Sequence, residues 1–455
     1  MATASRRPAA SCRRHKHGAD AALRFLYLLA LYLAVPVVST MLLWRGLRDR
    51  SYWRNFSQRF GFGARLVPQG VWLHAVSVGE VQACAPLVSA LSRRHPGLPL
   101  TVTTFTPTGS ARARALFGNV AQVRYVPYDL PGSVRRFFRR VQPRLAVIFE
   151  TELWPNLYRE CSRRRIPLVL ASARISARSV SRYHLVGSLF RETLARTALV
   201  AAQGAGDAER FRALGADPAT THVTGNLKFD FELPEGLAAR GARLRAQYAT
   251  DRPLWVAGST HGGGEEQAVL AAQRQVRMTH PSALLVLAPR HPPRFDEVAG
   301  VLEGSGLSFV RRSAAAASAA DASCAVLLLD SLGELLDFYA AADLAFVGGS
   351  LVPIGGHNLL EPAALGVPIL TGPNNSNSEE IARLLVARGA AEVVRDGTEL
   401  GARVSALLAD AAAREQMGAA GRASVDGNRG ALVKLLALIE PLLEAPEEMP
   451  PEDRA

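Results

Sequence analysis

The stretch FVGGSLVPIGGHNLLEPAALGVPILTGP, residues 346–373, contains the strands and the helix of one complete α/β unit. An apolar run at 344–347 enters a loop rich in Gly and Pro. A helix is predicted to begin near Asn358, and a second strand follows at 367–370. Because glycine has no Cβ, such a loop lets the backbone pass close to a bulky polar ligand, and the N-terminus of the next helix favours anions such as phosphate. The stretch therefore predicts a parallel sheet with a ligand-binding loop at a strand end.

Asn358 and Glu361 are three residues apart, so on the first turn of a helix both side chains face the same way. A carboxylate at that place can accept hydrogen bonds from the two vicinal hydroxyls of a ribose. The same spacing fits a capping box, with Asn358 as N-cap and Glu361 at N3. Spacing alone supports both interpretations equally, and the double-glycine loop favours ligand binding.

Strand-length apolar runs alternate with helix-length amphipathic stretches from Val71 onward, which predicts parallel sheets covered by helices. The alternation pauses at 229–236. We therefore expect an α/β protein with two Rossmann-like, doubly wound domains, 46–232 and 233–444, and a disordered tail, 445–455. The expected strands are 71–76, 98–105, 122–126, 145–149, 168–171, 199–202, 222–224, 254–257, 283–287, 308–310, 325–329, 344–347 and 367–370.

The N-terminal region, 1–45, is basic at first and then has no charged residue from 25 to 43. This run is near the minimum length of a membrane-spanning helix. A signal peptide is the alternative, but no clear small-x-small cleavage site follows. Trp44 and Arg45 instead resemble interfacial anchors. We expect an N-terminal membrane anchor helix that is not cleaved.

The chain carries a formal net charge of +13, and only three of its 53 basic residues are lysine. Lys228 is one of two lysines in the predicted folded body. No basic-aromatic module or zinc motif indicates nucleic-acid binding, so an anionic membrane surface or a phosphorylated substrate explains the charge as well. The four cysteines are far apart, which is typical of a reduced protein without a structural metal site.

Six short segments combine polar residues with glycine or proline at the expected strand ends. They are HAVSVGEV (74–81), TPTGS (106–110), ETELWPN (150–156), GNLKFD (225–230), APRH (288–291) and GGHNLLEPAA (355–364). Together, and in this order, they resemble the 3-deoxy-D-manno-octulosonic acid (Kdo) transferases. The resemblance implies a glycosyltransferase-B fold and inverting transfer of Kdo from CMP-Kdo to the lipid A precursor (lipid IVA) in lipopolysaccharide core biosynthesis. It also implies a location on the cytoplasmic face of the cell inner membrane.

The resemblance assigns three residues of the first domain to catalysis. Glu80 is the general base, and Glu150 and Lys228 stabilise the transition state. Glu80 begins a predicted helix after Gly79, and we expect the helix dipole to keep its carboxylate ionised. Taken alone, a glutamate at this position is more commonly a solvated first-turn residue. Glu150 and Lys228 also fit a structural ion pair between two strand ends.

The resemblance places CMP on the second domain. Arg290 is expected to offer a fork to the phosphate, although it also fits a solvated loop arginine. Residues 333–335 would otherwise be an ordinary helix start. The complete expected CMP site is Pro289, Arg290, Gly333, Glu334, Leu335, Asn358, Leu359, Leu360 and Glu361.

No metal or other cofactor is expected, because the leaving group is a monophosphate and the chain has no Asp-x-Asp pair to hold a divalent ion. The chain departs from the family pattern at one loop. Gly262, Gly263 and Gly264 follow His261 where the family pattern is His-Glu-Gly-Glu. Two carboxylates are missing there, so we assign this loop no catalytic role, although its N–H groups could contact a phosphate.

Three other functions compete with this interpretation. The fold alone would permit a UDP-sugar-dependent enzyme of the same fold with another lipid acceptor. A nicotinamide oxidoreductase is disfavoured, because no G-x-G-x-x-G opens the helix after the strand at 71 or at 254. A catalytically inactive, membrane-tethered binding protein would also fit the anchor, but the carboxylates and Lys228 argue against it.

Overall fold

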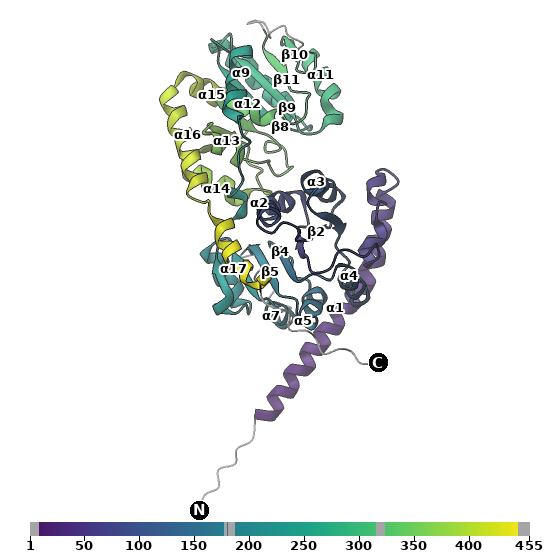
Figure 1. The fold of residues 1–455 in the computed structure, drawn as a ribbon. Coiled ribbons are helices and arrows are strands. Elements are labelled where there is room, and N and C mark those ends of the chain that lie inside the picture. The colour runs from purple at the N-terminus through teal and green to yellow at the C-terminus, as the bar shows by residue number, and fades with distance from the viewer. Residues whose placement is uncertain (1–8, 177–179, 181–186, 315–323, 445–455) are drawn as a thin grey trace, which may run out of the picture. The chain divides into compact units, whose positions relative to one another are not determined.

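The computed structural model describes residues 9–176, 180, 187–314 and 324–444. The chain forms two compact units. The first unit comprises the chain up to Phe231 and again from Arg429 onward, and the second unit is Glu232–Asn428. Each unit is one sheet covered by helices on its faces (Figure 1). The proposed tail at 445–455 lies outside the described residues.

The first unit has a seven-stranded sheet in the order β3-β2-β1-β4-β5-β6-β7, and every neighbouring pair is parallel. Alternate residues of its central strands point to two cores, with Leu73 in one and Trp72 in the other. Both faces are buried, which explains why a central strand can be a continuous apolar run, as in LAVIF at 145–149. The strands are β1 (Val71–His74), β2 (Leu100–Thr104), β3 (Gln122–Tyr125), β4 (Leu145–Phe149), β5 (Leu168–Ala173), β6 (Leu199–Ala202) and β7 (Thr221–Val223).

The helices of the first unit begin with α1, a long helix that lies beside α7 and contains the apolar run. Within the described chain, α1 is the one helix long and apolar enough to cross a membrane, over Ala22–Arg45. The helices are α1 (Ala9–Arg45), η1 (Arg50–Tyr52), η2 (Phe56–Phe60), α2 (Val78–Arg94), α3 (Pro107–Phe117), α4 (Pro131–Val141), α5 (Pro155–Arg163), α7 (Gly187–Leu194), α8 (Ala205–Ala213), η4 (Pro218–Thr220), η5 (Leu227–Phe229) and α17 (Ala431–Glu444).

The second unit has another parallel seven-stranded sheet, in the order β10-β11-β9-β8-β12-β13-β14. Its strands are β8 (Leu254–Thr260), β9 (Leu284–Pro289), β10 (Phe309–Arg311), β11 (Val326–Leu328), β12 (Leu344–Val347), β13 (Ile369–Thr371) and β14 (Ala391–Val393). Its helices are α9 (Leu237–Tyr248), α10 (Glu265–Thr279), η6 (Pro292–Arg294), α11 (Phe295–Glu303), α12 (Leu335–Ala341), α13 (Leu360–Leu365), α14 (Glu379–Ala387), α15 (Gly397–Ala409) and α16 (Ala411–Asp426). The thirteen expected strands are present, and the sequence pattern missed the short edge strand β14.

The last helix differs from the expected domain division, which assigned 233–444 to the second domain. Helix α17 buries Leu435, Leu436 and Ile439 in the core of the first unit. Asp230 caps it, accepting hydrogen bonds from the N–H of Gly430 at 2.6 Å and of Leu432 at 2.7 Å. A carboxylate at a helix N-terminus is stabilising. The chain therefore returns to the first unit at its C-terminal end.

Candidate active site

Both sheets place their polar strand ends beside a reversal of strand order. In the first unit the order reverses between β1 and β4, which pair from Val71 with Leu145 to His74 with Ile148. In the second unit it reverses between β8 and β12. Ligands of open α/β sheets bind outside the carboxyl ends of the strands at such a reversal. At the reversal in the first unit, the loops after β1 and β4 begin at Ala75 and Glu150. At the reversal in the second unit, the loops after β8 and β12 begin at His261 and Gly348.

Glu80 lies on the first turn of α2 and is only 8% exposed. Its Oε2 accepts a hydrogen bond from the Val76 N–H at 2.8 Å, and the Ser77 hydroxyl donates to its Oε1 at 3.1 Å. Ser77 is the N-cap of the helix, so the two residues form a capping box. Glu80 is therefore a held, buried carboxylate and not a solvated first-turn residue.

Burial of Glu80 opposes the expected effect of the helix dipole, which is to keep its carboxylate ionised. Burial, and then the nearby charge of Glu150, raise the pKa of Glu80 to about 7. The hydrogen bonds from Val76 and Ser77 lower the pKa but do not compensate for burial. A carboxylate that titrates near neutrality is suited to take a proton and to release it again.

Glu150 follows β4 directly and pairs with Lys228, with 2.9 Å between Glu150 Oε1 and Lys228 Nζ. Its second oxygen lies 3.8 Å from the Arg174 guanidinium. Glu150 has a φ of 56°, the left-handed region that a residue with a side chain seldom adopts. Such backbone strain occurs often at functional sites. The structure thus brings Glu80, Glu150 and Lys228 together at one strand-order reversal.

Glu152 is a further acid of this cluster, and burial raises its pKa. Its Oε2 accepts a hydrogen bond from the Trp154 indole at 2.7 Å. The sequence showed Glu152 at a strand end but not this partner. Because Glu152 and Glu150 also raise the pKa of Glu80, the cluster holds more acidic groups than it can readily ionise together.

Pro289 is the last residue of β9 in the second unit, and Arg290 follows it directly. Pro289 pairs in the sheet with Thr260 and is buried, whereas Arg290 is exposed. Across the described part of the chain, the Arg290 guanidinium has no hydrogen-bond or ion-pair partner, whereas Arg294 is paired with Glu266 at 2.6 Å. An exposed, unpaired guanidinium beside a strand end is available to an anionic ligand.

Residues 333–335 lead into α12, which begins at Leu335. The Glu334 side chain is already bound within the unit, because Arg312 donates to it at 2.7 Å and the Ser331 hydroxyl also donates to it. Leu335 and Tyr339 lie against the carboxyl end of β8. A Cβ at Gly258 would meet the Tyr339 hydroxyl at 2.1 Å and the Leu335 side chain at 3.1 Å. Gly258 is therefore required by close packing at this strand end.

Helix α13 begins at Leu360, two residues later than the expected start near Asn358. The Asn358 Oδ1 accepts from the Leu360 N–H at 3.1 Å, an Asx turn that leads the chain into the helix. Leu359 and Leu360 are buried, so neither side chain is open to a ligand. Glu361 is partly exposed. Burial, and then the nearby charge of Glu361, raise the pKa of Tyr339, so Glu361 on α13 lies near Tyr339 on α12.

Glu265 was missed by sequence reasoning, although it lies directly after the glycines at 262–264. Its buried carboxylate accepts N–H hydrogen bonds at 2.8 to 3.0 Å from His261, Gly349, Ser350 and Leu351. One carboxylate thus holds the ends of β8 and β12 together. The close approach also explains Gly348, where a Cβ would lie 2.8 Å from the carbonyl oxygen of Ser259.

His261 and His357 stack in this loop region, with 2.8 Å between their Nε2 atoms and 3° between their ring planes. Burial lowers the pKa of each to about 4, and the nearby charge of Arg290 acts in the same direction. The pair therefore shares a single hydrogen bond between neutral rings at pH 7. Because its charge affects both histidines, Arg290 lies near the loop that ends at Asn358.

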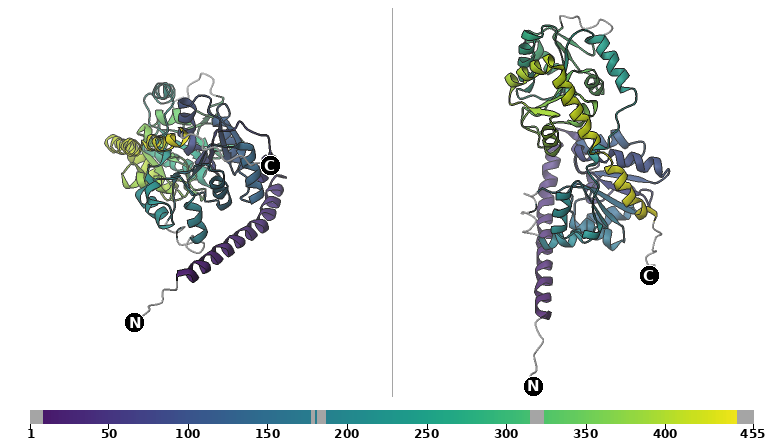
Figure 2. Two further views of the ribbon diagram at one scale, coloured as in Figure 1. Left: turned by 60° about the horizontal axis from the view of Figure 1, so that its bottom comes forward. Right: turned by 90° about the vertical axis from the view of Figure 1, so that its left-hand side faces the viewer.

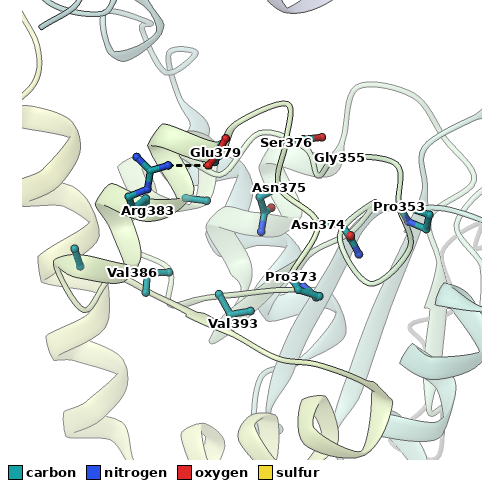
Figure 3. A pocket seen from close by; sticks show the side chains of 12 residues that line it. Pro353, Gly355, Pro373, Asn374, Asn375, Ser376, Glu379, Arg383, Val386 and Val393 are labelled. Carbon is teal, nitrogen blue, oxygen red and sulfur yellow. Dashed lines mark hydrogen bonds and ion pairs between the residues drawn. The ribbon is translucent and has the colours of Figure 1, made fainter. Parts of the chain in front are cut away.

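A cavity of about 620 Å³ lies behind this loop and is lined by residues from the loops near 353 and 374, from α14 and from β14. Figure 3 shows Asn374 and Asn375 on one side of it and the paired Glu379 and Arg383 on another. Arg290, Glu334 and Glu361 do not line it. The expected CMP residues are therefore not the residues of this cavity.

Comparison with solved structures identifies the class of this fold. Solved structures with a similar fold include the UDP-GlcNAc 2-epimerase of Neisseria meningitidis, with a TM-score of 0.54, 13% identity, and coverage of 82% of this chain and 100% of that chain. A putative UDP-N-acetylglucosamine 2-epimerase from Listeria monocytogenes has a TM-score of 0.53 at 16% identity, with coverage of 86% and 100%. The two units thus have the glycosyltransferase-B fold. The C-terminal CMP-Kdo binding domain of WaaA from Acinetobacter baumannii is 34% identical, covers 42% of this chain and 98% of that domain, and has a TM-score of 0.40.

The sequence comparisons are more specific. The family model described as 3-deoxy-D-manno-octulosonic-acid transferase (kdotransferase) matches residues 54–231. The 3-deoxy-D-manno-octulosonic acid transferase of Haemophilus influenzae is 41% identical over 425 residues, which are 92% of this chain and 99% of that protein. The Bordetella pertussis transferase is 39% identical over 433 residues, with the same two coverages. The chain therefore belongs to the Kdo transferases, enzymes of lipopolysaccharide core biosynthesis.

Proposed function

We propose that this enzyme transfers Kdo from CMP-Kdo to a lipid A precursor, lipid IVA, with inversion at the anomeric carbon. The observation that carries the proposal is the cluster in the first unit. Glu80 is a buried carboxylate with a pKa near 7, and Glu150 beside it is paired with Lys228. In this proposal the first unit binds the acceptor and the second unit binds CMP.

Glu80 takes the proton of the acceptor hydroxyl while that oxygen attacks the anomeric carbon of Kdo. Attack comes from the side opposite CMP. The bond from this carbon to the phosphate oxygen breaks, and CMP leaves with the bonding electrons. A sugar hydroxyl is a poor nucleophile at neutral pH, so removal of its proton during attack is required. Glu150 and Lys228 stabilise the charge that develops in the transition state.

The CMP residues divide by what their side chains can do. Arg290 offers an unpaired guanidinium to the phosphate, and Glu361 a carboxylate to the ribose. Pro289, Leu359 and Leu360 are buried and position the backbone around these groups. Asn358 turns the chain into α13. Gly333, Glu334 and Leu335 contribute main-chain groups, because the Glu334 carboxylate is held by Arg312.

The proposed reaction uses no metal cofactor. Among the residues the structure describes, no group of three or more His, Cys, Asp or Glu side chains could hold a metal ion. Because the leaving group is a monophosphate, we expect turnover to persist in EDTA. Loss of turnover that is restored by a divalent cation would contradict this part of the proposal.

We infer that the enzyme works at the cytoplasmic face of the inner membrane, because its proposed acceptor is a lipid. The apolar stretch Ala22–Arg45 of helix α1 supports attachment to a membrane. Competition between donors tests the substrate class. CMP should displace the bound donor at concentrations at which UDP does not, whereas tighter binding of UDP would favour a UDP-sugar enzyme. Binding of CMP-Kdo without turnover would favour an inactive binding protein.

A further inference from the structure

Helix α1 packs against the first unit over most of its apolar run (Figures 1 and 2). Val35 is buried in a cluster with Tyr128 and Leu130, and Leu31 and Val38 pack against the same cluster. Leu42 is also buried, one further turn along. This spacing of three, four and seven residues is one stripe of an α-helix. One side of α1 therefore packs its apolar side chains against the rest of the first unit.

A hydrogen bond fastens the other end of this stripe. The Tyr27 hydroxyl donates to Asp129 Oδ2 at 2.7 Å. Asp129 is only 3% exposed, and its carboxylate also accepts from the N–H groups of Asn156 at 2.9 Å and Leu157 at 2.8 Å. From Tyr27 to Leu42 the helix rises by about 22 Å, at about 1.5 Å per residue. The first unit thus contacts α1 along a length that is most of the apolar thickness of a bilayer, about 30 Å.

The outward side of α1 is apolar and uncovered. Its exposed large side chains are Phe25, Leu26, Leu29, Tyr32, Leu33, Val37, Met41, Leu43 and Trp44, each 44 to 69% exposed. At its C-terminal end, Arg45, Arg48, Arg50 and Arg54 are exposed, and Trp44 and Trp53 are 58% and 43% exposed. Apolar side chains beside tryptophan and arginine match the boundary between acyl chains and anionic headgroups.

A helix that crosses a bilayer is surrounded by lipid or by other membrane-embedded segments. To cross, α1 would have to leave the first unit, and this would expose the cluster around Tyr128 and take a hydrogen-bond donor from a buried carboxylate. We propose that α1 instead stays on the first unit, lies along the membrane surface, and inserts only its outward side into one leaflet that contains anionic lipids. This inference goes beyond the proposed function, because it concerns how the chain meets the membrane.

The arrangement also joins the membrane surface to the active site. Asp129 holds the first N–H groups of α5, and α5 directly follows the segment that carries Glu150 and Glu152. Tyr27 is therefore a positioning residue. Its hydrogen bond links α1 through Asp129 to the N-terminus of α5, where the segment that carries Glu150 and Glu152 ends.

Cys12 provides the test, because it precedes the apolar run and because Cys84, Cys161 and Cys324 are buried. The full-length protein is added to preformed, sealed vesicles of phosphatidylethanolamine and phosphatidylglycerol, so that its first units face outward, and is treated with a membrane-impermeant maleimide. A second protein, the reporter, carries Cys12→Ser and Asn119→Cys and gives the fraction of first units that face outward, since Asn119 is exposed. If α1 lies on one leaflet, Cys12 is labelled to the same extent as the introduced thiol of the reporter, before and after detergent is added. If Cys12 is protected until detergent is added while the reporter is labelled, α1 crosses the bilayer and the proposal is overturned.

A substitution pair tests the fastening itself. Tyr27→Phe removes one hydroxyl that donates to Asp129, and Tyr32→Phe is the matched control on the outward side, where Tyr32 is 56% exposed. We expect faster amide hydrogen exchange at Asn156 and Leu157 in Tyr27→Phe and unchanged exchange in Tyr32→Phe, both in the vesicles described above. Unchanged exchange in both variants would overturn the role of Tyr27. CMP binding is measured in the same two variants. A failure of the proposed CMP site is then distinguished from a failure of the role of Tyr27.

Discussion

Lys228 Nζ lies 2.9 Å from Glu150 Oε1, and these two residues are 78 positions apart in the chain. The pair joins the end of β4 to the short helix η5, beside the buried Glu80. The side chain of Lys228 is 22% exposed and that of Glu150 is 15% exposed, so the pair is partly screened from water. A partly buried pair can stabilise the fold, catalysis, or both.

Lys228→Arg should separate these roles. Arginine keeps the charge but replaces a compact ammonium by a planar fork, so the pair with Glu150 persists while its geometry at the substrate changes. We expect turnover to fall by about 10²- to 10³-fold, the usual effect of removing one electrostatic stabiliser, with the melting temperature within about 2 °C of the parent. Near-normal turnover in the arginine variant would mean that Lys228 is only a structural partner of Glu150.

Glu80→Gln tests the general base. Glutamine keeps the shape and the hydrogen bond from Val76 but cannot take a proton, so turnover should fall by about 10²- to 10⁴-fold while CMP affinity stays the same. The chain offers a matched control in Glu399, which occupies the same place in the capping box of α15 and accepts from the Arg395 N–H at 2.8 Å. Glu399→Gln should leave turnover unchanged. If both variants lose activity alike, the effect is on helix capping, and Glu152 becomes the candidate base.

The pKa of Glu80 predicts a pH profile. Since the base must be ionised, kcat/KM should rise with pH through about 7 and then level. This rise of kcat/KM with pH should be absent from the residual activity of Glu80→Gln. A rise that remains at the same pH in the glutamine variant would assign the titration to another group.

Stability should change with pH in the opposite sense. The folded-state pKa of Glu80 is raised above its ordinary value of 4.5, so the folded state binds this proton more tightly than the unfolded state does. The contribution to stability is therefore present below pH 4.5 and is lost as pH rises through about 7. Thermal melts should show that Glu80→Gln gains stability relative to the parent between pH 5 and pH 8. A constant difference over this range would contradict the raised pKa.

Arg290→Ala should weaken CMP binding. Loss of a charge-assisted contact to phosphate costs about 1.5 to 3 kcal/mol, which corresponds to about ten-fold or more in the dissociation constant. Arg388, an exposed arginine of the same unit, is the control, and Arg388→Ala should bind CMP normally. Equal dissociation constants for the two variants by calorimetry would remove Arg290 from the site.

The strands could be predicted from the sequence because fully buried parallel strands are continuous apolar runs. The sequence pattern missed strand β14, Ala391–Val393, which has only three residues, one of them a glutamate, and only Ala391 is buried. The pairing of Glu150 with Lys228 could be predicted, since an ion pair between two strand ends was one of the two interpretations of those residues. The pKa of Glu80 could not, because it depends on burial by segments far away in the chain. Glu265 was missed for a similar reason, since three of its four N–H partners lie more than 80 residues further on.

An assay of Kdo transfer tests the proposed function most directly. Purified full-length protein is incubated with CMP-Kdo and lipid IVA, and the lipid product and CMP are measured by mass spectrometry. We expect the lipid to gain the mass of Kdo, one CMP to be released for each Kdo added, and Glu80→Gln to give about 10²- to 10⁴-fold less of both. A folded protein that binds CMP but adds no Kdo to the lipid would contradict the proposed function.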